Sequence, residues 1–389
     1  MCLKASLKCE NGAIISEIKF VKRAIYTMKL HLLFIGNKFI YNIPLKEYII
    51  RNIEQKIDYI NSITYFKESD NSLFLYLEQE LNASSKLIIV TTKQNFSTIG
   101  KLISTVTSDN QILKENMLIP SNSSVFDNGS YLLEYKNSIV NVLHIDEMQK
   151  MPEILLQSQD STATIHIFYE DKDSAVAMLT PIAQTFDVNI DIVNLIDGWL
   201  RVAIVSKKYG NISKFIHSAK HLLPSKLIPS SNIVHYIIET LAASQKKITF
   251  AESCTGGLLS YYFTKENGAS KILDGSLVTY SNDLKENWLA VEQSTLEEFG
   301  AVSSEVVSQM SEGALNVSNA DYSISVSGIA GDTGGTLEKP VGTVHISVRT
   351  KTMHETIHLN LKGDRNYIQT QSVLFAVKML ISIDKEMFF

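Results

Sequence analysis

The chain has 389 residues, of which 45% are hydrophobic and 20% charged, a balance typical of a globular protein long enough for two or three domains. Its 36 Lys and Arg residues stand against 41 Asp and Glu residues, which gives a net charge of −5. Because no segment has the basic excess that nucleic-acid binding needs, we expect no nucleic-acid partner. The cysteines, Cys2, Cys9 and Cys254, form neither a disulfide framework nor a zinc pattern.

The richest apolar run near the N-terminus covers residues 32–43 and is interrupted by Asn37 and Lys38. It is too short and too polar to span a bilayer, and no signal-peptide pattern precedes it. We therefore expect a cytoplasmic protein that does not engage a membrane.

Residues 1–27 precede the first strand-like run and are interpreted as an N-terminal extension. From residue 28 to residue 150, strand-like runs alternate with helical periodicity. Strands are predicted at 32–35, 86–91 and 138–144, and helices at 45–59 and 73–81. This alternation is typical of an α/β domain with a mainly parallel sheet.

Residues 151–228 follow a βαββα order, which predicts a small α+β connector. Its strands are predicted at 163–169, 188–193 and 199–205, and its helices at 173–186 and 212–223. Pro224 and Pro229 lie among serines and mark a linker, so a domain boundary is predicted before residue 229.

Residues 229–389 predict a second α/β domain, with a sheet between two layers of helices. Strands are predicted at 248–251, 275–280, 322–326, 343–349 and 355–361, and helices at 232–244, 258–265, 282–289, 304–317 and 366–383. Of the 18 glycines, 12 lie in residues 240–389. Glycine allows close backbone approach and positive φ, so we expect the chemistry in this domain.

The first polar cluster is ITFAESCTGGLLS, residues 248–260, where a strand feeds a helix through a glycine turn. Ser253 lies in this turn, and free amides at a helix N-terminus favour an anion or a developing oxyanion. Thr255, Gly256 and Gly257 would supply those amides. The alternative is that Ser253 or Thr255 is an ordinary helix N-cap.

The second cluster is LVTYSNDLK, residues 277–285, at another strand end. Parallel strands place their carboxyl ends at one edge of a sheet, so Tyr280 and Lys285 are expected within reach of Ser253. Since a serine needs a base to become a nucleophile, a Lys/Tyr pair is the available chemistry, and the lysine can serve if burial or a neighbouring charge lowers its pKa. The alternative makes Tyr280 an edge aromatic and Lys285 a solvated charge.

The third cluster is the glycine-rich segment SVSGIAGDTGGTLEKPVGTV, residues 325–344. Its glycines, Gly328 and Gly331 among them, can offer bare amides to a phosphate or carboxylate. Lys339 within the segment and Arg365 after it would add positive charge. The alternative is a flexible hairpin loop with solvated charges.

Together these clusters closely resemble the C-terminal domain of the CinA family (competence/damage-inducible protein A), known as nicotinamide-nucleotide amidohydrolase. The shared stretches are AESCTGG, VTYSNDLK, GAVSSE (300–305), the glycine-rich EKPVGTV segment, and GDR (363–365). The resemblance covers residues 232–383. One departure is Gln369, where the family often has arginine.

The resemblance implies that Ser253, Tyr280 and Lys285 form a catalytic group acting on nicotinamide mononucleotide. Ser253 would attack the carboxamide, and the Lys285/Tyr280 pair would move its proton to the leaving ammonia. Backbone donors at 255–257 would hold the oxyanion, and the glycine-rich loop, Lys339 and Arg365 the phosphate. The resemblance also implies a homodimer, and no cofactor is expected.

Residues 28–150 and 151–228 occupy the positions of the family's molybdopterin-binding-like domain and its KH-like connector. The glycines and paired acids of the first are replaced by TKQNFSTIGKL, residues 92–102. Since metal-dependent ADP-ribose hydrolysis in the family needs carboxylates to hold the ion, we interpret this domain as a retained fold with a lost site.

His354 and His358 share one face of a predicted strand, but no acidic cluster accompanies them, so no metal site is expected. Two alternative functions remain open. One is a non-catalytic binding or scaffold protein in competence or DNA-damage responses. The other is an ADP-ribose pyrophosphatase, which the missing acids disfavour.

Overall fold

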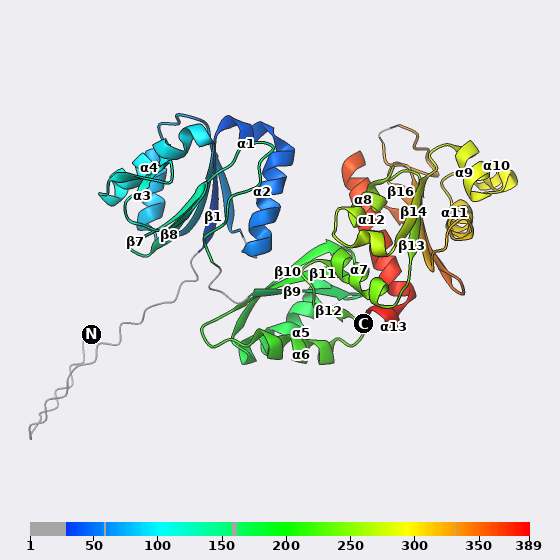
Figure 1. Cartoon of the computed structure of the whole chain (residues 1–389). Helices are drawn as coiled ribbons and strands as arrows, with labels where there is room; N and C mark the ends of the chain where they lie inside the picture. Colours follow the sequence, from blue (N-terminus) through cyan, green and yellow to red (C-terminus); the bar gives the residue numbers. More distant parts are fainter. Residues whose placement is uncertain (1–28, 58–59, 158–161, 332) are drawn as a thin grey trace, which may run out of the picture. The chain divides into compact units, whose positions relative to one another are not determined.

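The computed structural model describes residues 29–57, 60–157, 162–331 and 333–389. The chain divides into two units, Met1–Gln157 and Ser158–Phe389 (Figure 1). The expected N-terminal extension, residues 1–27, lies outside the described residues. In the part of the chain that the structure describes, no helix has both the length and the apolar character needed to cross a membrane.

The strands of the first unit are β1 (Leu30–Ile35), β2 (Ser62–Phe66), β3 (Lys86–Thr91), β4 (Gln111–Lys114), β5 (Met117–Pro120), β6 (Ser123–Asp127), β7 (Ser130–Tyr135) and β8 (Ser138–His144). Six of them form one sheet in the order β2-β1-β3-β8-β7-β6, and β4 and β5 form a separate hairpin. β2, β1, β3 and β8 are parallel, and β7 and β6 continue the sheet antiparallel. The sequence analysis does not predict β2 or β4 to β7, most of which have only four or five residues and therefore carry little periodicity.

Helices cover both faces of this sheet: α1 (Asn37–Tyr41) and α2 (Ile43–Lys56) one face, α3 (Leu73–Asn82) and α4 (Lys93–Thr107) the other (Figure 1). Successive residues of β1 serve opposite cores: Leu32 and Phe34 pack with α2, whereas Leu33 and Ile35 pack with α3 and α4. This explains why parallel strands buried on both faces are continuously apolar.

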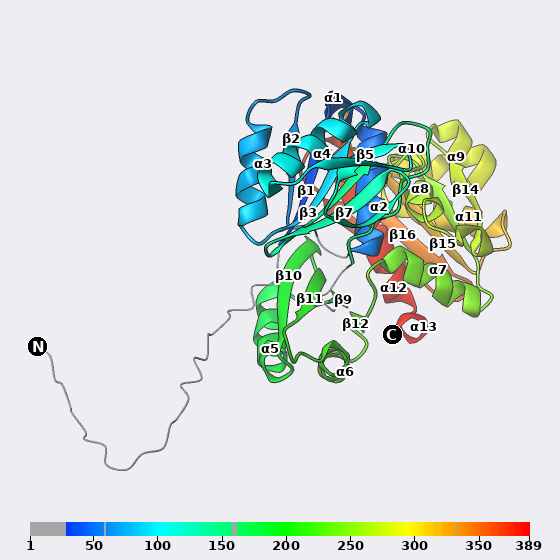
Figure 2. The same cartoon turned by 60° about the vertical axis from the view of Figure 1, so that its left-hand side comes forward.

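The second unit begins with a four-stranded antiparallel sheet in the order β10-β11-β9-β12. Two helices pack on one face of it (Figure 2). The elements are β9 (Thr162–Phe168), α5 (Lys172–Thr185), β10 (Val188–Ile196), β11 (Trp199–Ser206), α6 (Ile212–Leu222) and β12 (Leu227–Ile228). The βαββα order predicted for this segment is thus observed, with a short further strand.

The other face of this small sheet shares a core with the C-terminal part of the chain. Phe168, Ile196 and Trp199 are buried in the same apolar cluster as the C-terminal helices. Lys378 Nζ also donates a hydrogen bond to the Asp197 carbonyl oxygen at 2.6 Å. The segment before residue 229 and the domain after it therefore form one packed body, in contrast to the boundary predicted there.

A five-stranded sheet in the order β14-β13-β15-β16-β17 forms the centre of the C-terminal part. β13 is parallel to β14 and to β15, and β16 and β17 extend the sheet antiparallel. The strands are β13 (Ile248–Glu252), β14 (Leu273–Val278), β15 (Tyr322–Gly328), β16 (Thr343–Thr350) and β17 (His354–Asn360).

Helices again cover both faces of the sheet (Figure 1). One layer contains α7 (Ile233–Ala243), α8 (Leu258–Thr264), α12 (Arg365–Ile383) and α13 (Lys385–Phe388). The opposite layer contains α9 (Asn282–Leu289), α10 (Gln293–Phe299) and α11 (Ser304–Asn316). The expected mixed α/β, multi-domain architecture is confirmed.

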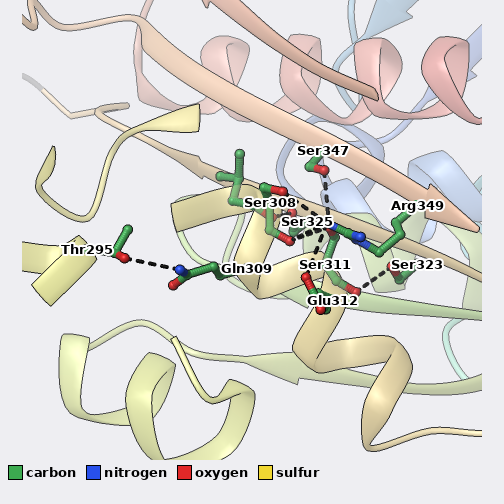
Figure 3. Close-up of polar contacts among 10 residues, drawn as sticks. Thr295, Ser308, Gln309, Ser311, Glu312, Ser323, Ser325, Ser347 and Arg349 are labelled. Atoms are coloured by element: carbon green, nitrogen blue, oxygen red, sulfur yellow. Dashed lines mark hydrogen bonds and ion pairs between the residues drawn. The ribbon is translucent and has the colours of Figure 1, made fainter. Parts of the chain in front are cut away.

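A seam of buried serines fixes α11 on this sheet. Ser323 and Ser325 of β15 are fully buried, and their hydroxyls donate to the main-chain carbonyls of Ser311 and Val307 (Figure 3). Ser311 Oγ lies 3.1 Å from Ser347 Oγ on β16. These hydrogen bonds satisfy polar groups that burial would otherwise penalise, and they allow a close approach of helix and strand.

The same helix positions α9. A Cβ added at Gly313 of α11 would lie 2.0 Å from the carbonyl oxygen of Leu289, the last residue of α9. Glycine is therefore required where the two helices touch. Since α9 carries Lys285, this contact between α11 and α9 also helps to position that lysine relative to the sheet.

Candidate active site

The candidate site lies where the parallel strands of the C-terminal sheet end. Ser253 directly follows β13, and its amide donates to the Val326 carbonyl of β15 at 2.9 Å. On the other side, the Thr279 amide donates to the Glu252 carbonyl at 2.9 Å. These contacts join the ends of β13, β14 and β15, so the turn after β13 and the segment leading to α9 meet at one edge.

Lys285 is brought to Ser253 from α9. Its Nζ lies 3.2 Å from Ser253 Oγ and donates to the carbonyls of Thr279 at 2.8 Å and Tyr280 at 3.4 Å. The residue is only 1% exposed, so it is not the solvated charge of the alternative interpretation. Burial lowers the pKa of Lys285 from its ordinary value of 10.5, and the nearby Cys254 thiol opposes that shift.

Lys285 Nζ donates to three oxygens, the carbonyls of Thr279 and Tyr280 and the Ser253 hydroxyl. If the amine loses one proton, its two remaining N–H bonds can stay on the carbonyls, and its lone pair is free for the Ser253 hydroxyl. The Glu252 carboxylate is engaged elsewhere, with the first turn of α8. This arrangement lets the lysine accept the hydroxyl proton.

The capping interpretation of Ser253 and Thr255 does not fit the geometry. The N-cap of α8 is Gly257, which has no side chain, and the amides at the start of that helix donate to Glu252 instead of to Ser253 or Thr255. Ser253 is 9% exposed, with its hydroxyl beside Lys285, and Thr255 Oγ1 has no partner among the described residues. Gly256 and Gly257 have φ values of +59° and +99°, which explains the glycine pair in the turn.

Sequence reasoning missed Glu252, which lies at the end of an apolar strand and is fully buried. Its carboxylate accepts hydrogen bonds from the Gly257 and Leu259 amides at 3.0 Å and from the Ser260 amide at 2.8 Å. The anion site expected at the start of α8 is therefore filled by the chain's own carboxylate. The signal in the sequence is a charge within ITFAE, a strand otherwise suited to burial.

Tyr280 and Arg365 form a separate pair. Tyr280 is 60% exposed, and its hydroxyl accepts a hydrogen bond from Arg365 Nη2 at 2.9 Å. Among the described residues, the Tyr280 hydroxyl makes no hydrogen bond with the side chains of Ser253 or Lys285. Arg365 begins α12 and lies against Gly331, where an added Cβ would be 2.6 Å from Nη1. Gly331 thus makes room for the guanidinium.

Lys339 and Gly328 stabilise the glycine-rich loop itself. Lys339 Nζ donates to the carbonyls of Phe299 at 2.6 Å and Val302 at 2.8 Å. A Cβ at Gly328 would lie 2.8 Å from Val344 Cγ2, so glycine is needed for the pairing of β15 with β16. The two residues expected to bind a ligand instead hold protein segments together.

The late-strand histidines include one stacked pair. His345 of β16 is paired with His358 of β17, with ring centroids 4.6 Å apart. Its Nδ1 lies 3.0 Å from Ser304 Oγ, and burial lowers its pKa to about 4. Across the described ranges, no group of three or more His, Cys, Asp or Glu residues is placed to hold a metal ion.

The corresponding edge of the first unit has a different chemistry. A cavity of about 990 Å³ lies between α4, the β4–β5 hairpin and the segment after β8. Asp146 borders it and contacts Lys38 Nζ at 2.9 Å, and Glu147 contacts the same ammonium at 3.4 Å. The hydrogen bond from Lys38 holds the pKa of the Asp146 carboxyl below its usual range.

Comparison with known proteins places the C-terminal part in a family. Residues 230–383 match the model of the CinA C-terminal domain. A CinA-like protein of Thermotoga maritima is 46% identical over 144 residues, which are 37% of this chain and 35% of that protein. A competence-damage inducible protein of Thermoanaerobacter sp. (strain X514) is 35% identical over 225 residues, 56% of this chain and 54% of that protein.

The chain thus matches between about a third and about half of the length of these relatives. Among solved structures, the competence/damage inducible protein of Agrobacterium tumefaciens is 37% identical, with 39% of this chain and 93% of that chain covered and a TM-score of 0.39. By this match, residues 230–383, which carry the Ser253–Lys285 pair, form a CinA C-terminal domain.

Proposed function

We propose that this protein is an amidohydrolase that converts nicotinamide mononucleotide and water into nicotinic acid mononucleotide and ammonia, within pyridine-nucleotide salvage. The observation that carries the reaction class is the buried Lys285 amine 3.2 Å from Ser253 Oγ. The substrate is taken from the family resemblance of the surrounding motifs. A serine with an adjacent base is the arrangement that acyl transfer requires.

In the proposed mechanism, Ser253 Oγ attacks the carboxamide carbon while its proton passes to Lys285 Nζ. The tetrahedral intermediate then collapses, the C–N bond breaks, and Lys285 returns the proton to the departing ammonia. The resulting ester on Ser253 is attacked by water, which Lys285 deprotonates in turn. The acyl–Oγ bond then breaks, Lys285 returns this proton to Ser253 Oγ, and the products are the carboxylic acid, which ionises to the carboxylate, and the free serine.

The burial of Lys285 supports this role. Desolvation disfavours the ammonium form, and the described neighbours of Nζ are two carbonyls and one hydroxyl. A larger fraction of the lysine is therefore neutral near pH 7 than for a solvated side chain. Proton transfer by a positioned base contributes about 10²- to 10⁴-fold to such reactions.

Tyr280 and Arg365 are assigned to the substrate phosphate rather than to proton transfer. The hydrogen bond between the Tyr280 hydroxyl and Arg365 Nη2 directs the guanidinium, which also lies against Gly331. Arginine suits phosphate because its planar donors match the oxygens of the anion. Tyr280 also contributes its main-chain carbonyl to Lys285.

The function is tested by incubating the full-length protein with nicotinamide mononucleotide and, separately, with ADP-ribose, each with and without a chelator. We expect ammonia from the first substrate at a rate that the chelator leaves unchanged. Ammonia release that stops on chelation and returns with a divalent ion would replace the serine mechanism with metal-activated water. Phosphate-ester products from ADP-ribose would favour the pyrophosphatase, and no turnover of either substrate would favour a binding or scaffold protein.

A further inference from the structure

The turn between β13 and α8 leaves the Thr255 main-chain amide without an acceptor among the described residues. Six amides of residues 253–260 donate to a carbonyl or to the Glu252 carboxylate: those of Ser253, Gly256, Gly257, Leu258, Leu259 and Ser260. The Cys254 amide, within the same described part of the chain, also has no acceptor in another residue. Of these two amides, the one of Thr255 has its direction fixed by a neighbouring side chain.

An amide without an acceptor is rare in a buried setting, and Thr255 is only 3% exposed. Its hydroxyl is likewise buried and has no partner within the described ranges. Space is nevertheless open beside the turn, because a Cβ added at Gly256 would meet no atom within 4 Å. The main-chain N–H and the hydroxyl of Thr255 are thus two donors close to Ser253 in the sequence, and neither has an acceptor among the described residues.

Gln369 fixes the direction of this amide. Its Nε2 donates to the Cys254 carbonyl oxygen at 2.7 Å. That carbonyl and the Thr255 N–H belong to one planar, trans peptide group, in which they point in opposite directions. The side chain on α12 therefore holds the N–H of Thr255 directed away from α12.

We propose that the Thr255 amide is the oxyanion donor of the hydrolase, and that Gln369 is a positioning residue that directs it. This inference rests on the proposed function. As Ser253 attacks, the carbonyl oxygen becomes negatively charged, and a fixed N–H stabilises that charge more than the neutral carbonyl. The Gly257 amide, which the sequence offered for this task, is excluded because Glu252 accepts from it at 3.0 Å.

The first test measures the kinetics of Gln369→Met, which keeps the length of the side chain and removes the donor. Loss of one oxyanion donor lowers kcat by about 10²- to 10³-fold, and misdirecting the donor should lower kcat by about tenfold or more while KM changes less than about twofold. Gln369→Arg restores a donor and should recover most of kcat. An unchanged kcat in Gln369→Met would overturn the inference.

The chain offers a matched control on the same helix. Gln371 Nε2 also donates to a main-chain carbonyl, that of Lys362, at 2.9 Å. Gln371→Met removes an equivalent hydrogen bond away from the turn, so kcat and KM should stay at wild-type values. A loss of kcat in both variants would show a general effect of loosening α12 and would overturn a specific role for Gln369.

The second test is independent of the natural substrate and follows the phosphorylation of Ser253 by diisopropyl fluorophosphate with mass spectrometry. Here the Ser253 Oγ–P bond forms, the P–F bond breaks, and negative charge develops on the phosphoryl oxygen. We expect slower labelling of Gln369→Met than of wild type or Gln371→Met. Equal labelling rates would overturn the inference whatever the substrate is.

This second readout also separates the two proposals. If the wild type labels at Ser253 but releases no ammonia from nicotinamide mononucleotide, the proposed substrate fails, and the labelling rates of the variants still decide the role of Gln369. If the wild type neither labels nor releases ammonia, Ser253 is not a nucleophile, and both proposals are overturned.

Discussion

Both sheets with parallel strands have a lysine at the carboxyl edge, but the two lysines have opposite surroundings. In the first unit, Lys38 pairs with Asp146 and Glu147, and its side chain is 19% exposed. In the second unit, Lys285 is 1% exposed and meets carbonyl and hydroxyl oxygens. One lysine is ion-paired with two carboxylates, whereas the other is buried without a carboxylate partner.

The comparison shows that charge compensation, and not the position of a lysine at the end of a sheet, decides what the lysine can do. An ion pair favours the ammonium form, which has no lone pair for a proton. Burial without a carboxylate favours the neutral amine. On this basis the edge of the second unit is suited to proton transfer, whereas the lysine of the first unit is engaged in ion pairs.

The largest expected effect comes from removing the buried amine. Lys285→Met keeps the bulk of the side chain and should lower kcat for ammonia release by about 10³-fold, because the base is lost. Lys38→Met is the matched control and should leave kcat within about twofold of wild type. Equal losses in the two variants, measured with the same preparation, would remove the distinction between the two edges.

A pH profile of kcat/KM sharpens the same contrast. The neutral form of Lys285 is the active one, so kcat/KM should rise about tenfold per pH unit on the acid side and level off at the pKa of this lysine. Because burial lowers that pKa, the plateau must begin below pH 10.5. A rise that continues unchanged to pH 10.5 would contradict a buried, neutral base.

The stability of Lys285→Met provides a smaller effect with a defined sign. Where the pKa is lower in the folded than in the unfolded chain, the unfolded chain binds more protons, so the wild type gains stability as pH rises from the folded pKa to about 10.5. The free energy of unfolding of Lys285→Met should therefore exceed that of wild type most at low pH, and this difference should shrink toward pH 10.5. Urea titrations of both proteins at several pH values measure the difference, and a difference that does not change with pH would argue against a lowered pKa of Lys285.

The smallest effect is expected from deleting the first unit. A fragment Ser158–Phe389 keeps the core that Phe168 and Trp199 share with the C-terminal helices. This fragment should release ammonia from nicotinamide mononucleotide at the rate of the full-length protein. A fragment 229–389 lacks these side chains and should melt at a lower temperature. If the longer fragment is folded but inactive, the first unit contributes to the site.

The sequence predicts the elements that carry the site because strong periodicity and glycine turns locate them. The turn with Ser253 and the helix with Lys285 follow from parallel strands whose carboxyl ends share an edge. The contacts of Tyr280 and Lys339 are made with residues far away in the sequence. The Tyr280 hydroxyl bonds to Arg365, and the Lys339 ammonium bonds to the Phe299 carbonyl. No local pattern encodes such contacts.

Two further features lie beyond the reach of sequence patterns for physical reasons. In the sequence, Glu252 is simply a charged residue at the end of a strand. In the structure its carboxylate accepts hydrogen bonds from the main-chain amides that a motif-based interpretation assigns to a ligand. The core around Trp199 forms where the second face of the small sheet packs on the C-terminal helices. Sequence periodicity indicates that this face is apolar, but it does not indicate which element packs against it. Both require the three-dimensional packing.

The most direct test of the central claim is the turnover rate of Ser253→Ala, measured together with substrate affinity and melting temperature. If Ser253 is the nucleophile, kcat should fall by several orders of magnitude while the fold and substrate binding persist, because base and nucleophile act as a unit. The contacts of Arg365 are untouched by this change. A variant that melts slightly lower but releases ammonia at close to the wild-type rate would contradict the account.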